Sequence, residues 1–169
     1  MQLAELLKDK DFKAKEKVDT ISRFLLNGEV SVDLIIDIAS LSKDSEKATC
    51  IEAIEFATKV NAGLATEKMF DFVTATLTEK APRIKWESAK VIANTAHRFT
   101  GNLDTAIANL RINTEHPGTV VRWSAALALG EIVKLNTKHH QELIPAIESI
   151  LAKEQKISIR KLYAETLKL

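Results

Sequence analysis

A short motif that recurs along the chain constrains its fold most strongly. Residues 84–93 read IKWESAKVIA, and a related stretch, VRWSAALALG, follows 37 residues later at residues 121–130. A third copy, IRKLYAETL, takes up the same phase 38 residues further on, starting from residue 159. A period of about 20–50 residues carried by helix-forming residues is typical of stacked helical repeats. We therefore predict an all-α chain made of stacked helix pairs.

Helix start and stop signals agree with that architecture. Ser31, Asp44, Thr66 and Thr137 are candidate N-caps, and Pro82 can occupy a first helical position without losing a needed N–H. Apolar residues recur at three- and four-residue spacing nearly throughout, as helices require. We predict nine or ten helices in antiparallel pairs, including residues 12–26, 32–41, 44–60, 103–112 and 158–167.

Small residues recur within the repeated motif. They occupy one broad side of the predicted helix and allow its backbone to approach the neighbouring helices closely. A degraded fourth copy is predicted 36 residues before the first, where Ala53 and Phe56 take the corresponding positions. The small position is Ala89, Ala126 and Ala164, and the aliphatic residue three positions later is Ile92, Leu129 and Leu167.

Composition favours one domain without a strongly charged surface. The 169 residues include 24 basic and 23 acidic side chains, and no linker or low-complexity tract divides them, so we expect residues 1–169 to form one domain. Residues 1–85 carry 13 basic and 15 acidic side chains, whereas residues 86–169 carry 11 and 8, an excess of about +3. That excess is too small for the basic surface of a dedicated nucleic-acid binder.

A single cysteine, Cys50, excludes an intramolecular disulfide and a cysteine-based zinc cluster. Its place in an apolar helical pattern predicts a buried core residue rather than a reactive thiol. Residues 1–17 contain only short apolar pieces broken by charge, which predicts neither a signal peptide nor a membrane span. We expect a cytoplasmic protein.

The best copy of the repeat resembles a known family. Residues 116–131, HPGTVVRWSAALALGE, are similar to the second-helix signature of HEAT repeats, which runs aspartate-proline, valine-arginine, two alanines and alanine-leucine-glycine. Residues 143–145, LIP, resemble the first helix of such a repeat, where a proline often bends the helix. His116 and Glu79 stand where that family usually has aspartate. The resemblance covers residues 116–133 best, 79–96 and 141–167 less well, and the chain before about residue 45 loosely.

This resemblance implies a right-handed α–α superhelix of about four to five HEAT-like helix pairs. It also implies a binding role, because repeat arrays of this kind present extended surfaces.

Two tryptophans are the leading candidates for such a surface. Trp86 and Trp123 share one repeat phase, about 200° round the helix from the main apolar residue. They are expected either to line the concave helix row and grip a partner or to pack against neighbouring repeats. Lys90 lies one turn beyond Trp86.

A second row of basic residues has the same period. Lys85, Arg122 and Arg160 can bind a phosphate or carboxylate of a ligand, or instead cap backbone carbonyls and link repeats. We include all three with Trp86, Trp123 and Lys90 in the predicted binding set.

No catalytic or metal-binding pattern emerges from the remaining polar residues. His139 and His140 are adjacent, project about 100° apart on a helix, and are interpreted with Glu142 as a solvated helix start. Glu52 and Glu55 are interpreted as surface charge. No nucleophile elbow or glycine-rich phosphate loop is present, so we predict no cofactor and no enzymatic activity.

The predicted function is therefore a binding scaffold or adaptor for a protein or peptide. A nucleic-acid or damaged-base binder is the first alternative, and a lyase or chaperone related to the bilin-attachment HEAT-like proteins is the second, by fold analogy alone. The partner and the oligomeric state stay open, as does whether the terminal helices cap the array or stack on another copy.

Overall fold

The fold is entirely helical over the part of the chain that the structure describes. The computed structural model describes residues 2–168 and contains ten α-helices, two short 3-10 segments and no strand in that range. No helix within it is both long enough and apolar enough to cross a membrane. The elements are α1 (Leu3–Lys8), α2 (Ala14–Leu26), α3 (Val32–Ser40), α4 (Asp44–Val60), η1 (Ala62–Leu64), α5 (Glu67–Thr76), α6 (Pro82–Thr95), η2 (Ala96–Arg98), α7 (Asp104–Asn113), α8 (Thr119–Lys134), α9 (His140–Lys153) and α10 (Ile157–Leu167).

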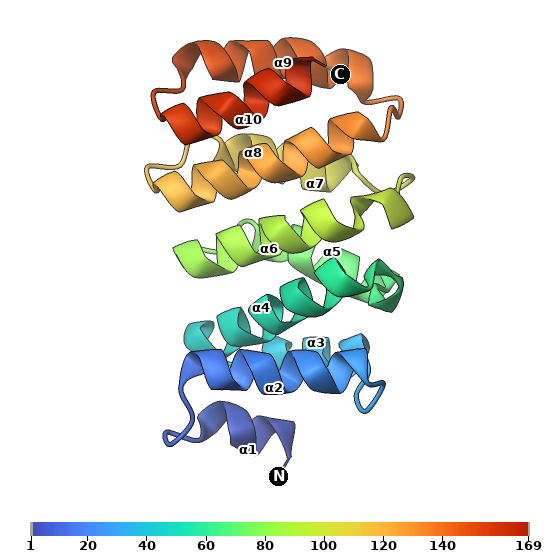
Figure 1. Ribbon diagram of the computed structural model, residues 1–169, viewed down its shortest axis with the longest axis vertical. Helices are drawn as coiled ribbons and strands as arrows, with labels where there is room; N and C mark the ends of the chain where they lie inside the picture. The colour runs from blue at the N-terminus through green and yellow to red at the C-terminus, as the bar shows by residue number, and fades with distance from the viewer. Residues whose placement is uncertain (1, 169) are drawn as a thin grey trace.

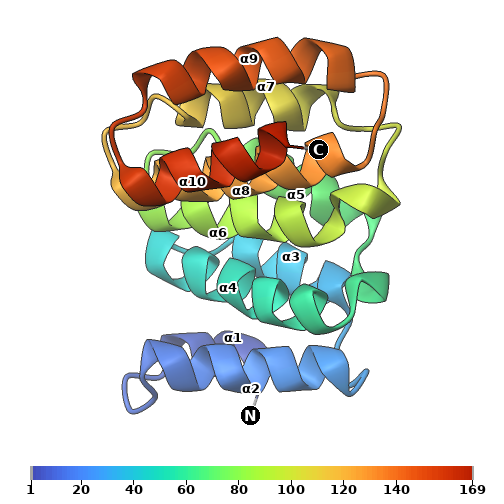
Figure 2. The same cartoon turned by 45° about the horizontal axis from the view of Figure 1, so that its top comes forward.

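The helices form five stacked pairs, each pair consisting of two helices consecutive in the chain (Figures 1 and 2). Helices α2, α4, α6, α8 and α10 lie side by side along one face, and each contacts the next. We call this face the second-helix row. The other five helices lie behind it, and α3, α5 and α7 contact one another in turn. The predicted α-solenoid of four to five helix pairs is confirmed.

Local signals position most helix starts as predicted. The Ser31 hydroxyl accepts the N–H of Leu34 at 3.2 Å, the Thr66 hydroxyl accepts that of Met69 at 3.1 Å, and Pro82 is the first residue of α6. These short polar side chains satisfy N–H groups that the first turn leaves without a backbone partner.

Two predicted caps are wrong. Asp44 is the first residue of α4 and Lys43 takes the N-cap position, so the Asp44 carboxylate contributes only its favourable charge in the first turn. Helix α9 starts later than predicted, with His139 at the N-cap. The Thr137 hydroxyl instead accepts the N–H of His139 at 3.2 Å and shapes the turn before the helix.

One continuous hydrophobic core runs through the stack. Ala89 and Ala126 are each 1% exposed, which places the small residues of the repeat between helices as predicted. The predicted fourth copy fails at Phe56, which is 47% exposed whereas Ile92 is fully buried. The N-terminal end of α4 matches that of α6 with a shift of 38 residues rather than 36, because both helices have lysine at their fourth position.

Candidate functional site

Every helix of the second-helix row has a basic residue at its fourth position. These residues are Lys17, Lys47, Lys85, Arg122 and Arg160. A cation in the first turn is unfavourable for the dipole of its own helix but favourable for the C-terminal carbonyls of the helix before it. Only the last three were predicted from the sequence, because the aligned motif does not extend to the first two. Counting residues from each helix start reveals the complete set.

Most of these side chains cap the preceding helix. Lys85 Nζ donates to the carbonyl of Leu77 at 3.0 Å, and Lys17 Nζ donates to that of Leu7 at 2.7 Å. Arg160 donates to the carbonyls of Leu151 and Glu154 at 2.8 and 2.7 Å. Burial lowers the pKa of Lys85. Lys85 and Arg160 were predicted either to bind a ligand or to cap backbone carbonyls, and their contacts show capping.

Three of the five also reach the next repeat. Lys47 Nζ lies 2.9 Å from Glu79 Oε1. Glu79 stands where HEAT repeats usually have aspartate, and this ion pair links two repeats. Lys85 Nζ donates to Asn113 Oδ1 at 3.2 Å. His116 Nδ1, by contrast, accepts the backbone N–H of Gly118 at 2.8 Å, a contact within its own turn.

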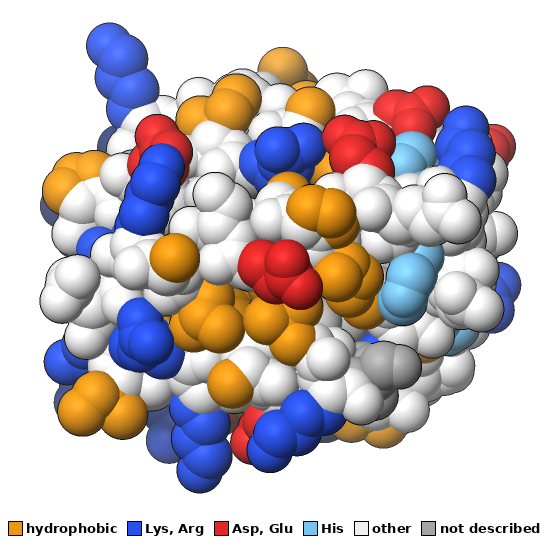
Figure 3. Space-filling model, turned by 90° about the horizontal axis from the view of Figure 1, so that it is seen from above, with side chains coloured by type: hydrophobic (Ala, Val, Ile, Leu, Met, Phe, Trp, Pro, Cys, Tyr) orange, Lys and Arg blue, Asp and Glu red, His pale blue; other side chains and the backbone are white. Residues whose placement is uncertain are grey.

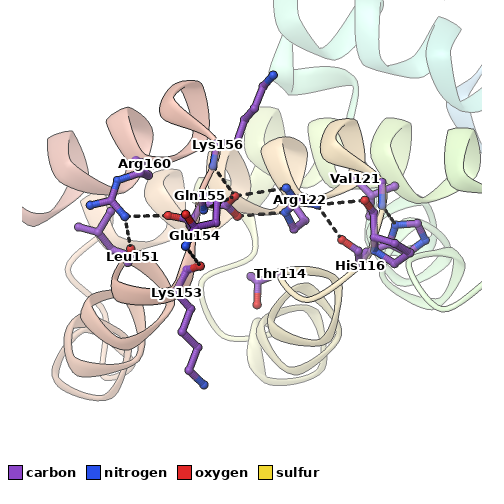
Figure 4. Close-up of polar contacts among 12 residues, drawn as sticks. Thr114, His116, Val121, Arg122, Leu151, Lys153, Glu154, Gln155, Lys156 and Arg160 are labelled. Carbon is purple, nitrogen blue, oxygen red and sulfur yellow. Dashed lines mark hydrogen bonds and ion pairs between the residues drawn. The ribbon is translucent and has the colours of Figure 1, made fainter.

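Arg122 makes the most extensive of these links (Figure 4). Its Nε and NH2 groups donate to the two carboxylate oxygens of Glu154 at 3.0 and 3.2 Å. Its NH1 group donates to the carbonyls of His116 and Pro117, both at 3.1 Å. A guanidinium with this many protein acceptors is a structural clamp between the last two repeats.

The Glu154 carboxylate is equally well satisfied. Besides Arg122, it accepts the backbone N–H groups of Gln155 and Lys156 at 3.1 and 3.0 Å. Burial alone would raise the pKa of Glu154, but the hydrogen bonds from Arg122 and these N–H groups outweigh it and hold the pKa below its usual value. Arg122 and Glu154 form one wall of a groove of about 810 Å³ between the end of α7 and α9.

The two tryptophans occupy equivalent places on the second-helix row, each as the fifth residue of its helix. Both are half-buried, but their surroundings differ. Trp123 packs against the hydrophobic core. Trp86 Nε1 donates to Glu87 Oε1 at 3.0 Å. The contacts thus divide the predicted set: Lys85, Arg122 and Arg160 donate to backbone carbonyls, whereas Trp86 and Lys90 contact side chains of α4 and α6 and Trp123 packs against the core.

Charged side chains from α4 and α6 form a network that reaches Trp86 through Glu87. Arg83 pairs with Glu52 at 2.5 Å, and Lys90 Nζ lies 3.6 Å from Glu87 and 3.9 Å from Glu55. We call these six residues the Trp86 cluster: Glu52, Glu55, Arg83, Trp86, Glu87 and Lys90. It contains three carboxylates and two cations.

Two of its carboxylates are buried. Glu55 and Glu87 are each only 4% exposed, so the interpretation of Glu55 as surface charge was wrong. This burial results from the packing of α6 alongside α4, and no local pattern in the sequence reveals it. Glu87 Oε2 has no hydrogen-bond partner among the described residues. Burial raises the pKa of Glu87, with Lys90 opposing that effect.

Apolar side chains flank this cluster along the row. Phe56 and Val60 on α4 are 47% and 75% exposed, and Val120 on α8 is 50% exposed. Leu127 lies one turn beyond Trp123 and is half-buried. The second-helix row therefore combines an apolar strip with one partly desolvated acidic cluster.

The remaining polar candidates lie apart from this surface. His139 is buried, not solvated as predicted, and its Nε2 lies 3.0 Å from Asp104 Oδ1. Within residues 2–168, no three His, Cys, Asp or Glu side chains are grouped to hold a metal ion. Cys50 is confirmed as a core residue, and burial, with Glu46 adding to it, raises the pKa of its thiol to about 12.

Solved structures with a similar arrangement of helices include designed armadillo repeat proteins. A designed armadillo repeat protein matches 98% of this chain with a TM-score of 0.76 at 16% identity, over 79% of its own length. A second, determined in complex with the peptide (KR)4, matches 98% with a TM-score of 0.72 at 15% identity, over 79% of its own length. An engineered protein matches 98% with a TM-score of 0.79 at 16% identity, over 78% of its own length.

The fold is that of the helical-repeat solenoids. No protein-family model matches the sequence, and no curated protein matches it either. The similarity to armadillo arrays, at this low identity, shows the fold alone and leaves the function to be inferred from the surface.

Proposed function

We propose that this solenoid is a non-enzymatic scaffold that binds an extended peptide segment of a protein partner along its second-helix row. The segment carries a basic side chain for the Trp86 cluster and apolar side chains for the strip formed by Phe56, Val120, Trp123 and Leu127.

The carboxylate of Glu87 carries this proposal. The Glu87 carboxylate is buried, and its Oε2 accepts no hydrogen bond and has only Lys90 Nζ near it, at 3.6 Å. Burying such a group is costly for the folded protein, and groups of this kind cluster at functional sites. A guanidinium or ammonium group beside Glu55 and Glu87 would supply the missing donors. The face of Trp86 also favours a cation.

Charge on this surface disfavours the nucleic-acid alternative. The carboxylates of the Trp86 cluster outnumber its cations, so a phosphate would meet net repulsion beside the tryptophan. The basic residues predicted to bind phosphate, Lys85, Arg122 and Arg160, already donate to backbone carbonyls. The (KR)4 complex of the similar designed protein gives a further reason to test basic peptides.

Fluorescence anisotropy of a labelled (KR)4 peptide tests the proposal. We expect saturable binding that the Trp86→Ala/Trp123→Ala variant weakens by more than about 2 kcal/mol, as loss of hot-spot aromatics does, with the helical circular dichroism signal unchanged. Glu87→Gln should weaken binding too, whereas Glu67→Gln on the exposed surface of α5 should not.

Two results would contradict the proposal. One is equal affinity of the wild type and the double tryptophan variant for the peptide. The other is tighter binding of a labelled single-stranded oligonucleotide that falls steeply with salt, which would favour a nucleic-acid binder.

A further inference from the structure

The outer side of the last helix pair is rich in apolar side chains. Seen from above the stack, hydrophobic side chains gather around an acidic one in the middle of this end (Figure 3). Ile157 is 81% exposed, and four further apolar residues of α9 and α10 are half-buried: Ile144, Leu151, Ala164 and Leu167. We define the C-terminal face as the residues Ile144, Glu148 and Leu151 of α9 with Ile157, Lys161, Ala164 and Leu167 of α10.

Helix geometry places these residues on one side. Ile144, Glu148 and Leu151 follow one another at four- and three-residue spacing, as do Ile157, Lys161 and Ala164. The other sides of these helices face elsewhere: Ala146, Ser149 and Lys153 of α9 line the groove shared with α7, and Leu162 and Thr166 of α10 face α8.

Comparison with the equivalent positions of the preceding repeat indicates which kind of contact this face can make. Ala164 is equivalent to Ala126, which is 1% exposed, and Leu167 is equivalent to Leu129, which is fully buried. Inside the stack these two positions are covered by neighbouring helices. The last repeat keeps the same small and aliphatic residues, and both remain half-buried. It therefore has the stacking surface of an interior repeat.

The opposite end of the stack is different. Helix α1 exposes Glu5 and Lys8, and α2 exposes Lys15, Glu16 and Asp19. Polar outer faces of this kind are stable in contact with water. Head-to-tail stacking of two molecules would cover these charges with the apolar C-terminal face, which is unfavourable.

Contact between two C-terminal faces avoids that cost and pairs their charges. A two-fold axis brings residue i of one copy to residue j of the other and j to i. The face carries one exposed anion, Glu148 on α9, and one exposed cation, Lys161 on α10, so a two-fold arrangement can bring Glu148 of one copy opposite Lys161 of the second. We propose that two copies of this chain associate end to end through their C-terminal faces, forming a two-fold dimer with one continuous helical stack.

Sedimentation equilibrium of the whole chain tests the dimer. The wild type should dimerise with rising concentration, and Ala164→Arg should raise the dimer dissociation constant at least about a hundredfold, because the added side chain and charge occupy the interface. Leu41→Arg is the matched control, since Leu41 is 93% exposed and lies away from this face. A wild type that stays monomeric up to about 1 mM would overturn the proposal, as would open-ended filaments.

A charge exchange separates this interface from any effect on folding. Glu148→Lys and Lys161→Glu should each be largely monomeric, because every pair across the two-fold axis then has like charges. Mixing the two variants should restore a heterodimer, in which both pairs are opposite again. Circular dichroism checks that each variant stays helical. Weakened singles without recovery on mixing would contradict the two-fold arrangement.

Discussion

At the scale of single residues, the energetics of this solenoid depend on which buried charges are satisfied. Glu154, at the end of α9, and Glu87, on α6, are both buried carboxylates, but the first accepts from Arg122 and two backbone N–H groups, whereas the second has one donor, Trp86. Their pKa values shift in opposite directions for that reason. The first stabilises the stack, and the second is the feature we assign to binding.

Glu87→Gln should therefore stabilise the free protein at neutral pH. Because the folded pKa of Glu87 is raised, its contribution to stability is fully present below the unfolded value near 4.5 and is lost as pH rises through the folded pKa. We expect a gain on the order of 1 kcal/mol at about pH 8 and none at about pH 4. Urea denaturation at the two pH values measures this gain in the free energy of unfolding. Equal gains at both would contradict destabilisation by the ionised Glu87 carboxylate.

Arg122→Met should have the opposite effect. It leaves the buried Glu154 carboxylate without its cation, and we expect a loss on the order of 3 kcal/mol at neutral pH. The depressed pKa of Glu154 stabilises the protein above about pH 4.5, and this contribution disappears as pH falls through the folded pKa, so the variant should lose less stability on acidification. Arg111→Met, which breaks the exposed pair with Glu142, should cost less than about 1 kcal/mol. Comparable losses in thermal melts of the two variants would argue against the clamp.

At the scale of helices, local patterns predicted the elements but not their surroundings. The starts of α3, α5 and α6 agree with the sequence because a cap or a proline acts within one turn. The burial of Glu55 was missed because it depends on the packing of α6 against α4. Lys17 and Lys47 were missed because the repeat was aligned on its alanines and tryptophans, whereas these lysines are recognised from their distance to the helix start.

The small residues of α8 give a further prediction, because they allow neighbouring helices to approach closely. Ala125 is fully buried in α8, so Ala125→Leu should force extra atoms between packed helices and cost about 1–3 kcal/mol. Ala108 on α7 is exposed, and Ala108→Leu should leave the melting temperature nearly unchanged. Chemical denaturation of both variants provides the comparison. A loss confined to the exposed position would mean that the repeat phase is misassigned.

At the scale of the whole molecule, stacking makes stability uneven along the chain. Helices α6 and α8 have second-helix neighbours on both sides, whereas α1 belongs to the outermost pair at its end. In repeat arrays each unit is stabilised mainly by its neighbours, so opening should begin at an end. Amide hydrogen exchange should therefore be slowest in α6 and α8 and fastest in α1. Uniform protection along the chain would indicate one cooperative unit instead.

Amide chemical shifts recorded during titration with unlabelled (KR)4 peptide locate the binding surface without any substitution. We predict saturating shifts concentrated in α4, α6 and α8, including the indole N–H of Trp86, with little change in α3, α5 and α7. Shifts confined to the groove between α7 and α9, or no saturating shifts, would contradict the assignment of the second-helix row as the peptide-binding surface.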